Sequence, residues 1–95
     1  MRAILYVIEC RDPKIRARYL GYTTDWKQCL EYRSDEYDYG SNARSKLYTF
    51  IREHGGWRNW VLKKLAQYGS REEAQIAKID LLERYPFELN SHLKF

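Results

Sequence analysis

The chain has 95 residues, of which 44% are hydrophobic and 16% aromatic, with seventeen Lys and Arg against thirteen Asp and Glu. This composition predicts one globular domain over residues 1–95, and the formal charge of +4 permits a nucleic-acid partner without establishing one. Two cysteines define neither a disulfide framework nor a zinc site. The N-terminus lacks a signal-peptide pattern and no run approaches twenty apolar residues, so we expect an intracellular protein that is neither secreted nor membrane-spanning.

The first quarter of the chain predicts two strands. Residues 3–9, AILYVIE, are almost all apolar and include β-branched and aromatic side chains, which is typical of a strand covered on both faces. Asp12-Pro13 is a turn signal, and residues 18–22 resume an extended pattern.

A helix is expected after the N-cap signal at residues 23–25 and should run to about Ser34. One face of that helix is predicted to hold Trp26, Cys29, Leu30 and Arg33, with Trp26 and Leu30 in the core. Residues 35–41, DEYDYGS, are interpreted as an acidic loop.

Two more helices and a strand follow. Ser41 or Asn42 is expected to cap a helix that runs to His54 and ends at two glycines, one of them left-handed. Its apolar stripe is Ala43, Leu47, Phe50 and Ile51.

Residues 59–65 are a strand candidate. The capping box at residues 70–73, SREE, predicts a last helix that runs to about Arg84. One broad face of this helix is expected to hold Ala74, Ala77, Lys78, Leu81, Leu82 and Tyr85. This order predicts a small α+β domain with a three-stranded antiparallel sheet flanked by three helices.

Several of these segments carry a family resemblance. Leu5-Tyr6 and Tyr19-Leu20-Gly21, followed by a helix, resemble the two halves of the GIY-YIG endonuclease signature. The block at residues 47–60, LYTFIREHGGWRNW, is similar to GIY-YIG proteins of large DNA viruses of eukaryotes, as are residues 71–74 and Leu89-Asn90. The resemblance covers nearly the whole chain and implies the GIY-YIG fold. A viral origin would place the protein in the host nucleus or in a cytoplasmic viral factory.

The resemblance also implies a nuclease site with two tyrosines, an arginine, a metal-binding glutamate and an asparagine. The metal would polarise the phosphate, and the arginine would offset charge in the transition state. Tyr6, Tyr19 and Asn90 stand at family positions. Cys29, however, occupies the arginine position, eight residues after the glycine of the signature, and Lys78 occupies the glutamate position. A thiol cannot donate the paired, charged hydrogen bonds that a guanidinium donates to phosphate oxygens. An ammonium repels a divalent cation.

The family site is therefore expected to be vestigial, with no catalytic residue, no metal and no cofactor. Its remnants would be Tyr6, Tyr19, Cys29, Lys78 and Asn90. Cys29 is interpreted as a buried filler, and Lys78 either as a solvated residue or as an ammonium that holds a phosphate or pairs with a carboxylate. A basic and aromatic surface on the cleft side would bind nucleic acid without sequence readout. Its predicted members are Arg16, Arg18, Arg33, Arg44, Lys46 and Lys78, with Tyr37 and Tyr39.

Two other functions stay open from the sequence. An active metal-dependent endonuclease would recruit a displaced acid such as Glu73 or Asp80. A homodimeric structural protein would use the old cleft, or the apolar tail, as its interface. The apolar residues of that tail are Phe87, Leu89, Leu93 and Phe95.

Overall fold

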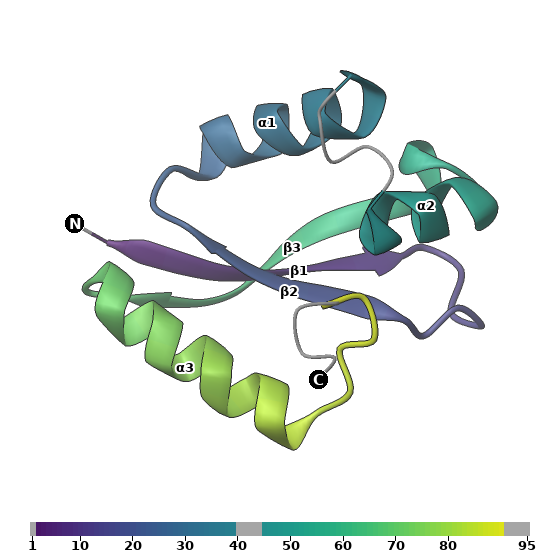
Figure 1. Cartoon of the computed structure of the whole chain (residues 1–95). Coiled ribbons are helices and arrows are strands. Elements are labelled where there is room, and N and C mark those ends of the chain that lie inside the picture. The colour runs from purple at the N-terminus through teal and green to yellow at the C-terminus, as the bar shows by residue number, and fades with distance from the viewer. Residues whose placement is uncertain (1, 40–44, 91–95) are drawn as a thin grey trace.

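The computed structural model describes residues 2–39 and 45–90 and contains a three-stranded antiparallel sheet of order β2-β1-β3. The strands are β1 (Ala3–Cys10), β2 (Arg18–Thr23) and β3 (Trp60–Tyr68). The helices α1 (Trp26–Tyr39) and α2 (Lys46–Glu53) lie on one face of the sheet, and α3 (Arg71–Arg84) lies on the other (Figure 1). The predicted α+β class, with this sheet and three helices, is confirmed.

The central strand β1 supplies both halves of the core because its side chains alternate between the two faces. Tyr6 and Ile8 belong to the larger buried cluster, which α1 and α2 cover. Val7 belongs to a smaller cluster with Leu20, against which α3 packs through Leu81. The described residues include no helix that is long and apolar enough to cross a membrane.

The register of the sheet places Tyr6 opposite Gly21 on β2. On the other side, the pairing with β3 shifts between Leu5 and Tyr6, so that Leu65 has no partner on β1 and is half exposed. An extra residue of this kind bends the strand that carries it. β3 also runs three residues beyond the predicted end at residue 65.

The first helix differs from its prediction in two ways. It extends to Tyr39, so the interpretation of residues 35–39 as loop is wrong. The cause is tertiary, because the Tyr37 ring packs 5.4 Å from Trp57 and 6.0 Å from Tyr48 between ring centres. The assignment of Leu30 to the core is also wrong, since that side chain is 41% exposed. Trp26 packs against the larger cluster, as predicted.

The second helix begins at Lys46 and is capped by the Ser45 side chain, which accepts from the Tyr48 amide. The caps predicted at Ser41 and Asn42, and the stripe residue Ala43, lie outside the described residues. Leu47 and Ile51 are buried, and Phe50 packs against them. Both Gly55 and Gly56 have positive φ, 99° and 79°, after the helix ends at His54, so the predicted left-handed stop is confirmed.

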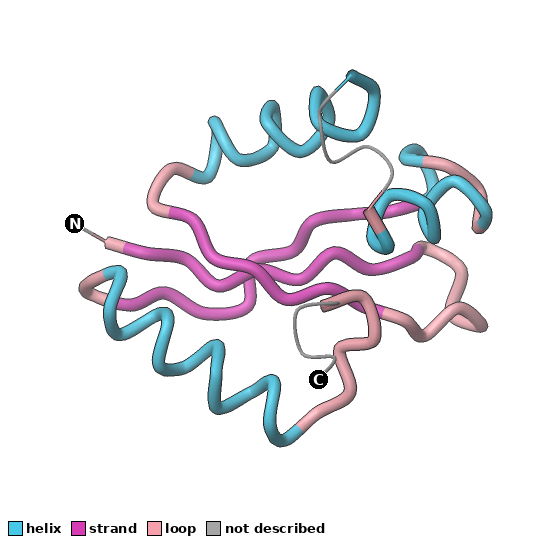
Figure 2. The backbone as a smooth tube through the Cα atoms, in the orientation of Figure 1, coloured by secondary structure: helices cyan, strands magenta, loops and turns pink. Residues whose placement is uncertain are grey.

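The last helix has the predicted bounds, with the Ser70 hydroxyl capping the Glu73 amide. Tyr85, which the sequence places on the same face as Leu81, is 52% exposed, because the chain leaves the helix there in an extended conformation. The segment that follows turns back to β2, where the Leu89 amide donates to the Arg18 carbonyl (Figure 2).

Candidate functional site

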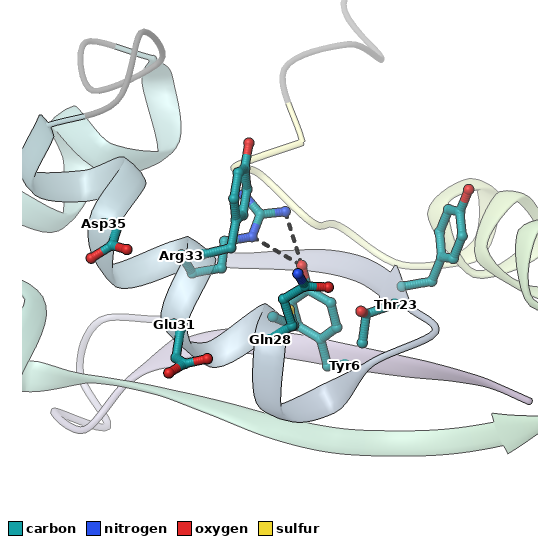
Figure 3. A pocket seen from close by; sticks show the side chains of 9 residues that line it. Tyr6, Thr23, Gln28, Glu31, Arg33 and Asp35 are labelled. Carbon is teal, nitrogen blue, oxygen red and sulfur yellow. Dashed lines mark hydrogen bonds between the residues drawn. The ribbon is translucent and has the colours of Figure 1, made fainter.

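A single arginine side chain joins four elements of the fold. The guanidinium of Arg33, on α1, donates to the Tyr6 hydroxyl through Nε at 3.0 Å and through Nη2 at 2.9 Å (Figure 3). Nη2 also donates to the Tyr19 hydroxyl at 3.2 Å, and Nη1 donates to the Tyr48 hydroxyl at 3.1 Å. We call these four residues the arginine–tyrosine cluster. It brings together side chains from β1, β2, α1 and α2.

The sheet register explains why the tyrosines converge. Tyr6 and Tyr19 point to the same face of neighbouring strands, and the residue opposite Tyr6 is Gly21. A Cβ at Gly21 would lie 2.6 Å from the Tyr6 Cζ and 3.1 Å from the Tyr19 ring. Glycine is therefore required for the ring of Tyr6 to lie flat over β2. The Trp26 ring holds the other side of Tyr6, 5.8 Å away in an edge-to-face contact.

A cavity of about 590 Å³ opens beside the cluster, between α1 and the end of β2. Tyr6 and Arg33 line its inner wall, and Tyr22 stands at its outer side. Two exposed acids of α1, Glu31 and Asp35, lie on the same cavity (Figure 3). The other lining residues are Thr23, Gln28, Cys29 and Tyr32. Its volume is in the range of small-molecule sites, and its inner wall presents hydroxyl and guanidinium groups.

The cluster contains one cation, Arg33, and two buried phenols whose pKa values are raised. Burial raises the pKa of the Tyr6 hydroxyl above its usual range, and the nearby Arg33 guanidinium opposes this shift without cancelling it. Burial likewise raises the pKa of Tyr48. Within the described part of the chain, no carboxylate forms an ion pair with Arg33. The half-buried guanidinium is therefore held by three tyrosine hydroxyls, and no described carboxylate lies within ion-pair distance of it. The Glu36 carboxylate is nevertheless close enough to the cluster to help raise the pKa of Tyr48.

The residues at the family positions have different places. Tyr6 and Tyr19 lie together in the cluster. Cys29 is buried beside them, as predicted for a filler, and lines the same cavity. Asn90 is buried beside β2, where its side chain accepts from the Leu20 amide and donates to the Leu20 carbonyl, both at 2.8 Å. It thus extends the edge of the sheet, and both of its polar groups are occupied.

Lys78 lies apart from the arginine–tyrosine cluster. Its ammonium is 5.6 Å from the centre of the Tyr22 ring, and it lines a second cavity beside α3 rather than the one that Arg33 lines. The two cavities meet at Tyr22, which lines both. Lys78 is half-buried, and within the described residues it forms no ion pair with a carboxylate.

The predicted basic surface is distributed over several places. Arg16 and Arg18 lie together at the other end of β2, where the Arg18 guanidinium stacks over Phe87 at 4.8 Å. Lys46 is exposed at the start of α2. Arg44 and the side chain of Tyr39 lie outside the described residues. Of the predicted set, Arg33 alone lies among the signature tyrosines, within the described chain.

The divalent metal that the family resemblance implies does not fit these side chains. The described residues hold no group of three His, Cys, Asp or Glu that could ligate a metal ion. The displaced acids considered from the sequence are engaged elsewhere: Asp80 pairs with Arg84 at 3.2 Å, and Glu73 contacts its cap, Ser70. The cationic Lys78 stands at the family glutamate position. We therefore derive no chemical step through a metal.

Sequence reasoning placed Arg33 on the cleft side with Tyr6 and Tyr19 but missed its hydrogen bonds to their hydroxyls, and it missed Tyr48 altogether. Arg33 follows Cys29 by four residues, so it lies on the same side of α1 one turn later. That spacing was the available signal, since a long side chain can reach back over the preceding turn. Tyr48 gave no signal, because its neighbourhood depends on how α2 packs on the sheet.

Comparisons with protein-family models, curated proteins and solved structures give no match to this chain.

Proposed function

We propose that this protein is a degenerate member of the GIY-YIG superfamily that binds a nucleic-acid phosphate at the arginine–tyrosine cluster and does not cleave it. The observation that supports the proposal is a half-buried guanidinium, that of Arg33, with no described carboxylate at ion-pair distance. Charges withdrawn from water are normally paired, because leaving one unpaired costs free energy. Three neutral hydroxyls meet the geometric needs of the guanidinium but not its charge. An anionic ligand would supply the missing partner.

The cluster offers donors to such an anion. Four of the five N–H groups of the guanidinium are used on tyrosine oxygens. Each phenol that accepts from Arg33 still has its own proton to donate. Tyr19, which is partly exposed, would hold the anion through its O–H donor, while Arg33 supplies the charge behind it and the buried Tyr6 fixes the guanidinium. Charge-assisted hydrogen bonds of this kind are about twice as strong as neutral ones.

The same features disfavour cleavage. A tyrosine acts as a general base only when its hydroxyl can give up its proton near the working pH. The raised pKa of Tyr6 keeps that hydroxyl protonated at neutral pH. The side chain at the position of the family metal ligand is an ammonium, that of Lys78. The alternative of an active endonuclease with a displaced acid would need Glu73 or Asp80 to leave their present partners.

The acidic side chains around the cavity limit the number of phosphates that can contact the arginine–tyrosine cluster. Glu31 and Asp35 would repel further phosphates, so we expect one or two phosphates to approach the cluster. Each phosphate contacted contributes about −0.9 for a duplex, or about −0.7 for a single strand, to the slope of log K against log salt. The measured slope should therefore be shallow, between about −1 and −2.

The alternative of a homodimer receives less support. Its proposed interface included Phe87 and Leu89, which are 7% and 2% exposed and belong to the core. Leu93 and Phe95 lie outside the described residues.

The test is titration of a fluorescent short duplex and a short single strand, by anisotropy, at two salt concentrations. Arg33→Gln should weaken binding at least about tenfold, since a hydrogen bond to a charged group contributes about 1.5–3 kcal/mol. Arg71→Gln is the matched control, because Arg71 is exposed at the start of α3 and outside the cavity. Equal binding by wild type and Arg33→Gln would contradict the proposal. Nicking of plasmid DNA with Mg²⁺ or Mn²⁺ that vanishes in Tyr6→Phe would contradict the absence of cleavage.

A further inference from the structure

The helix α3 is apolar on two opposite sides, and only one of them is covered by the sheet. Ala74 is fully buried on the inner side, and Leu81 packs there against the smaller core cluster. On the outer side, Ile76 is 69% exposed and Ile79 is 58% exposed. An amphipathic surface helix normally shows polar residues on its outer side. Two exposed isoleucines one turn apart therefore mark a surface that a partner could cover.

These isoleucines belong to a groove rather than to a flat patch. A cavity of about 590 Å³ lies between α3 and the edge strand β2, with the Tyr22 ring as one wall and Leu82 at its base. The wall is fixed, because the Gln75 side chain donates to the Tyr22 hydroxyl at 3.0 Å and the Lys78 ammonium stacks on the ring. The groove is thus an ordered apolar channel beside the sheet edge.

Acidic side chains mark both ends of the groove. Glu72 and Glu83 line it, and they are separated by eleven residues of α3, about 16 Å along the helix axis. The one cation that lines the groove, Lys78, is already stacked on Tyr22. An acidic groove on a chain of charge +4 selects for a basic partner. It disfavours a nucleic-acid strand, whose phosphates the two carboxylates would repel.

Charge also disfavours a second copy of the chain. If two α3 helices packed antiparallel about Ile76 and Ile79, Glu72 of one copy would face Glu83 of the other. Like charges placed together at an interface cost free energy. The complementary shape is a helix of about four turns with apolar residues at i, i+3, i+4 and i+7 and a Lys or Arg near each end.

We propose that the groove between α3 and β2 binds a basic amphipathic helix of another protein. The Ile76 and Ile79 side chains would meet the apolar stripe of that helix, and Glu72 and Glu83 would pair with its basic ends. This surface is independent of the arginine–tyrosine cluster, although the two cavities adjoin at Tyr22. The protein would then hold a nucleic acid and a partner protein on two sides of the same strand.

The test uses two synthetic helical peptides with the same apolar stripe, one with Lys at both ends and one with Glu. Fluorescence anisotropy should show at least about tenfold tighter binding of the Lys peptide to the wild-type protein. The Glu72→Lys/Glu83→Lys variant should reverse this preference. Ile76→Ser/Ile79→Ser should abolish binding of both peptides, with little change in stability because both side chains are exposed.

Four outcomes would overturn the proposal. The first is equal binding of both peptides to the wild type, and the second is a charge-reversal variant that keeps the wild-type preference. The third is a concentration-dependent dimer in sedimentation that Ile79→Ser dissociates, since the groove would then be occupied by a second copy. Peptide binding that survives Ile76→Ser/Ile79→Ser would equally place the site elsewhere.

Discussion

Replacement of Arg33 by methionine separates a ligand-binding arginine from a structural one. Methionine keeps the unbranched apolar stem and removes the guanidinium with its charge. Four hydrogen bonds to tyrosine hydroxyls are lost, and at about 0.5–1.5 kcal/mol each they contribute about 2–6 kcal/mol. Against this loss, the variant no longer has to desolvate a charge that has no anionic partner within the described chain.

The desolvation cost decides the net effect. Full burial of an ion has a desolvation cost of several kcal/mol even after relaxation. For the half-buried Arg33 guanidinium this desolvation cost is about 2–3 kcal/mol. The two effects largely offset each other. We therefore expect Arg33→Met to lower the free energy of unfolding by no more than about 4 kcal/mol, while under the proposed function it removes nucleic-acid binding.

The assay is urea unfolding followed by tryptophan fluorescence, with the m-value as a check on two-state behaviour. Arg71→Met is the control for loss of one exposed positive charge and should change the free energy by less than about 0.5 kcal/mol. A loss above about 5 kcal/mol for Arg33→Met would refute the reasoning. In that case the tyrosines would compensate the guanidinium fully, and Arg33 would be a structural clamp that needs no anion.

Two further predictions concern the tyrosines of the same cluster. Gly21→Ala should lower the free energy of unfolding by about 1–3 kcal/mol, because the new methyl would lie 2.6 Å from Tyr6 in a packed site; a loss under about 0.5 kcal/mol in urea unfolding would mean that the Tyr6 ring moves freely. In alkaline solution, stability should be intact below the ordinary tyrosine pKa of about 10 and should fall above it, because the raised pKa of Tyr6 keeps the folded form protonated while the unfolded chain ionises. The expected slope is about 1.4 kcal/mol per pH unit for each such tyrosine, and Tyr6→Phe should reduce it in a pH series of unfolding curves.

The sequence predicted most of the fold because the relevant signals are local. The apolar run of β1, the glycine stop after α2 and the cap at Ser70 each act within a few residues of their position. The last turn of α1 could not be predicted in this way. Its residues are acidic and aromatic, and their helical state depends on Tyr37 packing against Trp57, twenty residues away in the sequence.

The candidate site could likewise be predicted only where its signals are local in the sequence. The helical stripe of α1 was predicted correctly at Cys29 and Arg33, but apolar periodicity assigned the core to Leu30, which is 41% exposed. A charged residue on an inward face is normally discounted by such patterns. Only the convergence of four elements reveals that Arg33 is the inward residue. Tyr48 could not be identified at all, because no local pattern relates α2 to the two signature tyrosines.

The two departures from the family pattern are not equivalent, and their difference supports binding without cleavage. A residue four positions later on a helix is rotated by about 40° and displaced by about 6 Å along the axis. Helical side chains point back toward the N-terminus, so Arg33 covers the turn of Cys29 and brings its guanidinium to Tyr6 and Tyr19. If the resemblance holds, Arg33 would supply the positive charge of the family arginine from a position one turn away. The carboxylate has no such replacement. The acids nearest to Lys78 on α3 are Asp80, paired with Arg84, and Glu83, which lines the outer groove with Glu72. Under the proposed function, a site that keeps a cation near Tyr6 and Tyr19 and has an ammonium where the resemblance implies a metal ligand would attract phosphate without a metal to promote its hydrolysis.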